Sequence, residues 1–245
     1  MAKQKLKRFK EFSEYGHTFD FAYDLKGKWR SSVFKNNNPI VLELGCGKGE
    51  YTVALAKEFP GKNFIGIDIK SNRMWVGASK AIEQHLTNVA FMRAIMHRIN
   101  ELFDDGEVDE IWITFPDPFV RMRSAKHRLT HSRFLRLYKA ILKPGGLINF
   151  KTDSDELFSF TINMLSHLQI EPAVIENNVH ANADAEPLLK NVRTHYENLF
   201  MKKGKTIKFT RFSLDELQEE QAKKFEDWFE AERLKLVAEG KSIGI

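Results

Sequence analysis

Cysteine and long apolar runs are the most obvious shortages in this chain. Its 245 residues include one cysteine, Cys46, so an intramolecular disulfide is excluded. Apolar stretches stay well short of the roughly 18 residues that a membrane-spanning helix needs. The basic start of the chain leads into KRFKEFSEYGHTF, which lacks the apolar core of a signal peptide. We therefore expect a cytoplasmic protein with no membrane association.

Internal repeats, low-complexity tracts and clear linkers are also lacking. Hydrophobic residues make up 42% of the chain, and phenylalanine alone occurs 20 times, which is enough for a packed core and argues against disorder. The length suits one large α/β domain. We expect a basic, aromatic N-terminal arm in residues 1–38, a central domain in residues 39–212 and an amphipathic helical extension in residues 213–245.

Acidic residues are absent between Pro118 and Ala140, although the whole chain has a net charge of only +5. The part of this stretch up to residue 129 carries four cations: Arg121, Arg123, Lys126 and Arg128. It follows the sequence FPDP at 115–118, where two prolines exclude a regular helix or a central strand. A single carboxylate, Asp117, before a cationic run indicates a reacting centre beside a polyanion site. A solvated basic loop fits the local sequence equally well.

From residue 39 onward, apolar strands alternate with helices. The alternation predicts a Rossmann-like α/β fold with a mostly parallel, seven-stranded sheet and helices on both faces. Right-handed crossovers would bring the carboxyl ends of the strands to one edge, where ligands bind. The expected strands are 40–44, 63–68, 88–92, 108–115, 147–151, 171–177 and 206–212, and the expected helices are 51–59, 71–85, 131–142 and 155–168, with helical character near 99–103.

Two segments near the C-terminus have distinct patterns. The polar segment 180–190 indicates a loop or a short helix. The sequence SLDE at 213–216 has the form of a capping box, which predicts that a helix begins there. Packing on the domain best explains the apolar stripe of this helix, and a subunit interface is the alternative. The stripe consists of Leu217, Phe225, Trp228, Phe229 and Leu236.

A glycine-rich loop at 45–49 joins the first strand to the first helix, and Asp68 ends the second strand. Glycines there allow the backbone to approach a ligand, and the carboxylate can accept both hydroxyls of a ribose. The dinucleotide motif requires a third glycine where this chain has Glu50, and a carboxylate would repel a pyrophosphate. The E-x-G-x-G-x-G spacing from Glu43 resembles instead the first motif of class I S-adenosylmethionine methyltransferases.

Four motifs together resemble the bacterial tRNA (guanine-N7)-methyltransferases. Besides the glycine loop, segment 115–129 matches that family's FPDPW followed by a basic cluster and an arginine–leucine pair. The sequences KTD at 151–153 and THYE at 194–197 match two further family motifs in the right order. The resemblance spans residues 43–197. It implies transfer of a methyl group from S-adenosylmethionine to N7 of a guanine in tRNA, namely guanine 46 of the variable loop.

The resemblance also implies roles for individual residues. The S-adenosylmethionine pocket would be lined by Glu43, Gly45, Gly47, Asp68 and Asp117, with Asp117 as the catalytic residue. The tRNA would contact Arg121, Arg123, Lys126 and Arg128, and the substrate would also meet Asp153, Thr194 and Glu197. Two positions depart from the family pattern: Phe119 replaces a tryptophan, and Ile95 replaces an acid or asparagine near the adenine.

Several alternatives remain open from the sequence. The Asp117-Pro118 pair is similar to the D-P-P-Y motif of methyltransferases that act on amino groups of bases or proteins. A non-catalytic RNA-binding homologue is another possibility, because Ile95 departs from the family pattern at the adenine. His127 and His131 stand four residues apart without a carboxylate or cysteine to complete a set of ligands, so no metal site is predicted. The sequence does not decide between a monomer and a homodimer.

Overall fold

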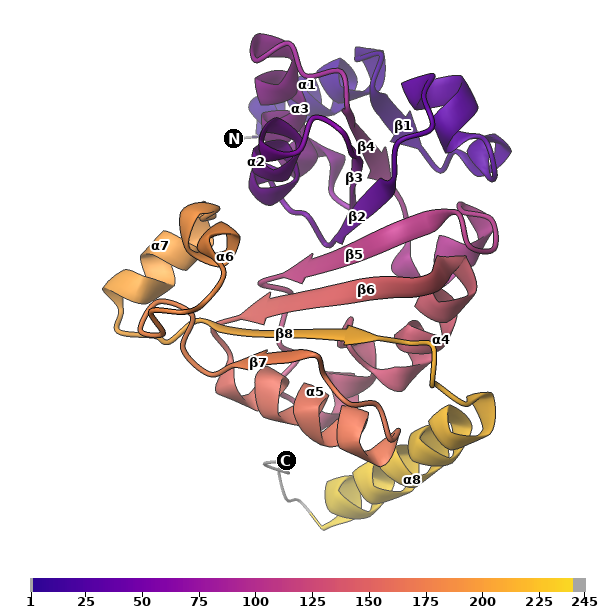
Figure 1. Cartoon of the computed structure of the whole chain (residues 1–245), viewed down its shortest axis with the longest axis vertical. Coiled ribbons are helices and arrows are strands. Elements are labelled where there is room, and N and C mark those ends of the chain that lie inside the picture. The colour runs from indigo at the N-terminus through magenta and orange to yellow at the C-terminus, as the bar shows by residue number, and fades with distance from the viewer. Residues whose placement is uncertain (1, 240–245) are drawn as a thin grey trace.

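The structure, a computed structural model, describes residues 2–239; residues 1 and 240–245 of the predicted terminal segments lie outside this range. The described residues form one eight-stranded sheet in the order β1-β4-β3-β2-β5-β6-β8-β7 (Figure 1). Strand β8 pairs antiparallel with both of its neighbours, and the other pairs are parallel. The strands are β1 (Thr18–Asp20), β2 (Ile40–Leu44), β3 (Asn63–Asp68), β4 (Val89–Arg93), β5 (Val108–Thr114), β6 (Leu142–Thr152), β7 (Val174–Glu176) and β8 (Lys208–Ser213).

Helices cover both faces of the sheet, as the alternating pattern predicted. One face packs against α1, α2, α3, α6 and α7, and the other against α4, α5 and α8. The α-helices are α1 (Ala2–Glu14), α2 (Glu50–Glu58), α3 (Ser71–Glu83), α4 (Ser132–Ile141), α5 (Asp155–His167), α6 (Pro187–Asn191), α7 (His195–Lys202) and α8 (Glu219–Ala238). The sheet is therefore the middle of three layers, and its central strands are shielded from water on both sides.

Strand β2 illustrates why the central strands are apolar throughout. Successive side chains of a strand point to opposite faces, so Ile40, Leu42 and Leu44 enter one core and Val41 enters the other. All five residues of β2 are buried. A parallel strand covered by helices on both faces must carry apolar side chains in both directions, and the buried Glu43 is the exception.

The eighth strand, β1, comes from the N-terminal segment and was not predicted. Its three residues pair in parallel with the edge of β4. Phe12 of α1 and the fully buried Trp29 enter the two cores, and the Trp29 indole donates a hydrogen bond of 3.0 Å to the carbonyl of Leu102. The strand escaped prediction because three residues are too few to show an alternating pattern.

The predicted capping box at 213–216 is wrong. Ser213 is the last residue of β8, and α8 begins only at Glu219. The Ser213 hydroxyl accepts a hydrogen bond from the amide of Asp215, and the Asp215 carboxylate in turn accepts from the amide of Gly145 at 3.0 Å. The side chains of Ser213 and Asp215 therefore stabilise a turn against the first residues of β6.

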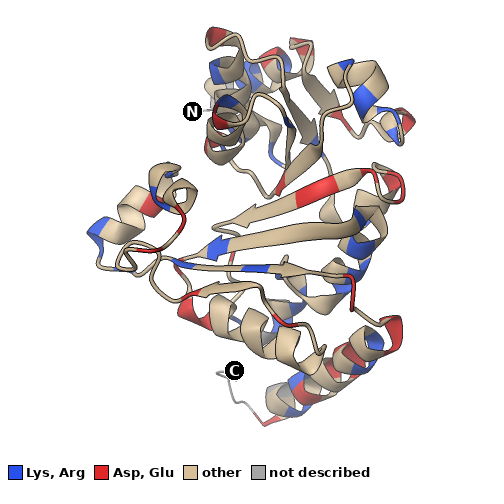
Figure 2. Ribbon diagram, viewed as in Figure 1, with Lys and Arg blue, Asp and Glu red and all other residues tan. Residues whose placement is uncertain are grey.

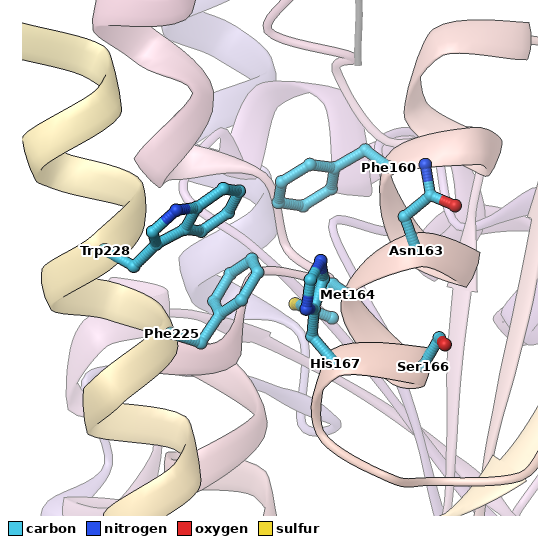
Figure 3. Close-up of a pocket in the computed structure, with 7 residues that line it drawn as sticks. All are labelled: Phe160, Asn163, Met164, Ser166, His167, Phe225 and Trp228. Carbon is cyan, nitrogen blue, oxygen red and sulfur yellow. The ribbon is translucent and has the colours of Figure 1, made fainter. Parts of the chain in front are cut away.

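Helix α8 lies across α4 and α5 on the face of the sheet shown at the bottom right of Figure 1. Its apolar stripe is largely buried: Leu217, Phe225 and Phe229 are each less than a tenth exposed. The Trp228 indole stays half-exposed beside the ring of His167, and both border a small cavity of about 160 Å³ between α5 and α8 (Figure 3). Packing on the domain thus accounts for most of the stripe.

A membrane-spanning segment is not found among the helices of residues 2–239, none of which is both long and apolar enough.

Candidate active site

A cavity of about 890 Å³ opens at the carboxyl ends of the central strands. This volume suits a ligand of cofactor size. Five predicted cofactor residues line it, and so do two of the predicted substrate residues: Glu43, Gly45, Gly47, Asp68, Asp117, Asp153 and Thr194. The remaining predicted residues, Arg121, Arg123, Lys126, Arg128 and Glu197, do not line the cavity.

The glycine loop forms the floor of the cavity through its backbone. Gly45, Gly47 and Gly49 all have positive φ angles, between 56° and 74°, which residues other than glycine rarely adopt. A Cβ atom on Gly49 would lie 2.4 Å from the ring of Phe91, whereas one on Gly47 would meet no atom within 4 Å. The loop is therefore tight against the sheet and open toward the cavity.

Asp68 is fixed at the end of β3 by two backbone amides. Its carboxylate oxygens accept hydrogen bonds from Gly47 at 3.0 Å and from Lys70 at 2.9 Å. Each oxygen keeps a further lone pair, and Asp68 lines the cavity. This arrangement suits a carboxylate that receives a pair of hydroxyl donors from a ligand.

Glu43 lies at the end of β2 and is 4% exposed. Its side chain accepts hydrogen bonds from the Thr52 amide at 2.8 Å, from the Thr52 hydroxyl and from the Thr114 hydroxyl at 2.6 Å. Burial raises the pKa of Glu43 to about 7, because desolvation outweighs these three donors. A carboxyl group with this pKa changes its charge when a cationic ligand approaches.

The opposite end of the cavity, after β4, is apolar and aromatic. Ile95 and Met96 follow the strand, and the His97 ring lies 4.7 Å from that of Phe134 and 6.2 Å from that of His127. Burial, followed by the charge of Arg133, lowers the pKa of His97, which favours the neutral ring. Along the edge, the ends of β4, β3 and β2 thus offer apolar side chains, a partly exposed carboxylate and a buried acid, in that order.

Asp117 stands in a turn after β5 that is unusual in its backbone. The flanking residues Phe115 and Phe119 have φ angles of 48° and 42°, a region that costs free energy for bulky residues. Pro116 and Pro118 lie between these two residues, and the ring of each proline fixes its own φ angle. The Asp117 carboxylate is exposed at the cavity and makes no hydrogen bond or ion pair with any residue of 2–239. The turn therefore presents a rigidly held, unpartnered acid.

Arg128 holds this turn from behind, contrary to its predicted contact with tRNA. It is 6% exposed, and its guanidinium donates hydrogen bonds to the carbonyls of Pro118 at 3.0 Å and Phe119 at 3.3 Å. The same group lies 4.4 Å from the ring centroid of Phe160. Burial lowers the pKa of Arg128, as expected for a cation withdrawn from water. The sequence revealed its charge but not its burial.

The other three cations of the basic run are on the surface. Arg121 and Arg123 are exposed, and Lys126 is partly exposed. Their side chains form no hydrogen bond or ion pair within residues 2–239. Arg121 directly precedes the short 3₁₀ helix Met122–His127, and Arg123 and Lys126 lie within it. His127, the last residue of this helix, lines the cavity.

Helix α7 closes the cavity on the other side of Asp117 and was missed by the sequence analysis. Thr194 caps this helix by accepting a hydrogen bond from the Glu197 amide at 3.0 Å. The next residues, Tyr196 and Phe200, line the cavity, and the Phe200 ring lies 6.3 Å from that of Phe115. The sequence does contain a signal for this helix, because T-x-x-E at 194–197 is the pattern of a helix start.

Glu197, which the resemblance placed at the substrate, lies inside the protein and does not line the cavity. It is fully buried, and its carboxylate forms an ion pair of 2.8 Å with Lys151, which is also fully buried. The His180 ring nitrogen lies 2.9 Å from the same carboxylate. Lys151 also donates a hydrogen bond of 2.7 Å to the carbonyl of Leu189. The pair therefore fastens α6 and α7 to the end of β6, close to the partly buried Asp153, whose pKa burial raises.

Comparison with known proteins agrees with this geometry. The model of a family described as "Putative methyltransferase" matches residues 37–210. The tRNA (guanine-N(7)-)-methyltransferase of Christiangramia forsetii is 44% identical over 87% of this chain and 99% of its own length. The enzyme of the same name from Porphyromonas gingivalis is 45% identical over 79% of this chain and 79% of its own length. The one from Bacteroides thetaiotaomicron is 41% identical over 87% of this chain and 87% of its own length.

Solved structures share the fold at low sequence identity. An antibiotic-related methyltransferase superimposes with a TM-score of 0.59 at 18% identity, covering 81% of this chain and 96% of that one. The 16S rRNA methyltransferase KamB gives 0.57 at 14% identity, covering 74% and 90%. These structural similarities establish the Rossmann-like methyltransferase fold, and the similar sequences reported above also establish the family. The chain belongs to the tRNA (guanine-N(7)-)-methyltransferase family.

Proposed function

We propose that this protein transfers a methyl group from S-adenosylmethionine to N7 of a guanine in tRNA, namely guanine 46 of the variable loop. The observation that carries the proposal is the unpartnered carboxylate of Asp117, held at the mouth of a cofactor-sized cavity in a chain of this family. The surface cations Arg121 and Arg123 follow it directly in the sequence. A methyl donor and an RNA would then meet at Asp117.

The residues along the edge of the sheet fit S-adenosylmethionine. The apolar side chains of Ile95 and Met96 suit the adenine, and Asp68 can accept both ribose hydroxyls. The open backbone of Gly47 leaves room for the methionine part, beside Glu43. S-adenosylmethionine supplies a methyl group bound to a positively charged sulfonium.

The chain's main task in the reaction is to orient the guanine. N7 of guanine has a lone pair in the ring plane and no proton, so methylation there needs no general base. Holding the reactants in line lowers the barrier by up to about 7–11 kcal/mol in well-oriented systems. The rigid turn around Asp117 can provide this orientation, since its backbone is fixed by two prolines and by the hydrogen bonds of Arg128.

Asp117 also has an electrostatic task. The purine ring becomes cationic as N7 is methylated, and a carboxylate fixed next to the ring stabilises that charge. The same carboxylate can accept hydrogen bonds from N1 and N2 of the guanine. Because Asp117 has no partner within residues 2–239, no existing interaction must be broken first. The reaction then needs no covalent intermediate with the protein.

The tRNA would be positioned by its backbone. Arg121, Arg123 and Lys126 are available to neutralise phosphates, which fixes the register of an RNA without reading its bases. Binding of tRNA should accordingly weaken as salt is added, with a contribution of about one unit per phosphate contact to the slope of log affinity against log salt.

Incubation of the protein with unmodified tRNA and S-adenosylmethionine labelled in the methyl group tests the proposal. Nucleoside analysis should find the label in 7-methylguanosine. Asp117→Asn should reduce the turnover while leaving the affinity for S-adenosylmethionine nearly unchanged. Label in N6-methyladenosine or in another amino-methylated base would replace the proposal with amino-group methylation. Absence of both transfer and cofactor binding would favour a non-catalytic RNA-binding role.

A further inference from the structure

Three lysines at the end of α7 and in the turn that joins it to β8, together called the basic turn, have no role in the site described so far. Lys202, Lys203 and Lys205 are exposed, and their side chains make no hydrogen bond or ion pair within residues 2–239. By contrast, Lys208, which begins β8, is buried and paired with Asp155. Figure 2 shows this basic turn at the outer end of α7, beyond the carboxyl ends of β5 and β6. The turn is a strong local concentration of unpaired positive charge.

The turn belongs to the same rigid element as the wall of the cavity. Helix α7 carries Tyr196 and Phe200, which line the cavity, and ends at Lys202. A helix rises about 1.5 Å per residue, so the lysines lie about 12 Å or less along the axis from its first turn. The buried ion pair of Lys151 and Glu197 anchors α7 to β6. The basic turn is therefore held at a fixed separation from Asp117.

The charge of the turn also alters the field at the cavity. Asp153 lines the cavity, and Asp155 and Glu156 follow it at the start of α5. Lys205 acts electrostatically on all three carboxylates and lowers their pKa values, although burial raises the pKa of Asp153 overall. Without these lysines, a polyanion would approach three acids on this side of the cavity.

We infer that Lys202, Lys203 and Lys205 bind the phosphate backbone of the RNA substrate, as a second contact on the other side of Asp117 from Arg121 and Arg123. This inference rests on the proposed function. Cations on both sides of the reacting centre hold the strand at two points, whereas a contact on one side leaves it free to pivot. The contact carries no sequence specificity, since ammonium groups meet phosphates as point charges.

A triple variant, Lys202→Gln/Lys203→Gln/Lys205→Gln, tests the inference. Binding of an unmodified tRNA transcript is measured at several salt concentrations by filter binding or fluorescence anisotropy. The slope of log affinity against log salt should become shallower by about three units, one for each lost lysine. In methyl-transfer assays, KM for tRNA should rise while kcat at saturating tRNA is largely retained. The affinity for S-adenosylmethionine should not change.

The matched control removes the same charge elsewhere. Lys28, Lys35 and Lys57 are exposed lysines near the amino ends of the strands, at the opposite edge of the sheet, and their substitution by Gln should leave the slope nearly unchanged. Substitution of the three turn lysines by Arg should keep the slope of the wild type. If the triple Gln variant does not fold, the three single variants should each remove about one unit.

An unchanged affinity and slope in the triple Gln variant would overturn the inference, as would an equal effect of the control variant. These outcomes differ from failure of the proposed function, in which the wild-type protein itself would form no 7-methylguanosine. The binding measurement does not depend on catalysis, so the two questions are answered separately.

Discussion

At the scale of single residues, Glu43 has the most consequential environment. Burial places its pKa at about 7, well above that of a carboxyl group in water. The side chain therefore carries a proton on a large share of the molecules near neutral pH. A cationic ligand in the cavity favours the ionised form, so its binding is coupled to the release of this proton.

The affinity for S-adenosylmethionine should rise with pH for this reason. Below the pKa of Glu43 the proton must first be removed, which weakens binding by about tenfold per pH unit, and above the pKa the affinity should level off. Titration calorimetry between about pH 6 and about pH 8, in buffers of different ionisation enthalpy, measures both the affinity and the released proton. Glu43→Gln should bind more weakly and lose this pH dependence. A pH dependence that survives the substitution would assign the proton to another group.

The residues of the site differ in how well the sequence predicted them. The family resemblance implied that Gly45, Gly47, Asp68 and Asp117 share one pocket, and the structure brings them to one cavity. Arg128 and Glu197 were assigned to the substrate although both are buried and paired within the protein. A sequence shows which residues carry charge, whereas their exposure depends on tertiary packing.

At the scale of elements, the turn between β5 and α4 depends on Arg128. The guanidinium makes two hydrogen bonds to its carbonyls and packs on Phe160, an arrangement that lysine cannot reproduce. Arg128→Lys should therefore lower kcat by about tenfold or more through loss of orientation at Asp117. Arg128→Gln removes the charge as well, and the salt dependence of tRNA binding should still stay unchanged, because the buried guanidinium bonds to carbonyls of the protein.

Arg123→Gln is the matched comparison for this prediction. Arg123 is exposed in the same segment, and its loss should make the salt slope shallower by about one unit while kcat at saturating tRNA is retained. Single-turnover rates and salt titrations on Arg128→Lys, Arg128→Gln and Arg123→Gln distinguish the two roles. If Arg128→Gln made the salt slope shallower as Arg123→Gln does, Arg128 would contact the tRNA after all.

The attachment of α7 should depend on the ion pair inside the protein. Glu197→Gln leaves the Lys151 ammonium buried without a counter-charge, which should cost about 3–5 kcal/mol in the free energy of unfolding. Glu186→Gln breaks a partly exposed pair with Arg211 and should cost less than about 1 kcal/mol. Urea denaturation of the two variants makes the comparison. Equal costs would show that the buried pair does not anchor the helix.

Prediction of elements from the sequence succeeded where the pattern was long or was bounded by strong stop signals. Strands β2, β3 and β5 and helices α4 and α5 were expected within a few residues of their observed bounds. Strand β1 is short and pairs only at an edge, and α8 begins later than its capping pattern indicated, because Asp215 bonds to Gly145. Helix α7 was not predicted, although T-x-x-E at 194–197 is the pattern of a helix start.

At the scale of the whole molecule, the strand order explains the layout of the site. The carboxyl ends of the central strands lie along one edge of the sheet in the spatial order β4, β3, β2, β5 and β6. Along this edge, the proposed cofactor residues lie on the β4 side of Asp117, and the proposed substrate residue Asp153 lies on its β6 side. The overall fold was predictable because strand–helix alternation and right-handed crossovers leave few other arrangements. The position of the basic turn at the end of α7 depends on tertiary contacts and was not predictable.

The central claim is that the methyl group goes to N7 of one guanine in tRNA. The most direct measurement compares two synthetic tRNAs that differ at this guanine alone, one carrying guanine and the other 7-deazaguanine, which has a carbon atom in place of N7. Both should bind with similar affinity, since phosphate contacts dominate binding. Transfer of labelled methyl should occur to the first tRNA and be abolished in the second. Equal transfer to both would contradict the account, because the methyl group would then go to another atom.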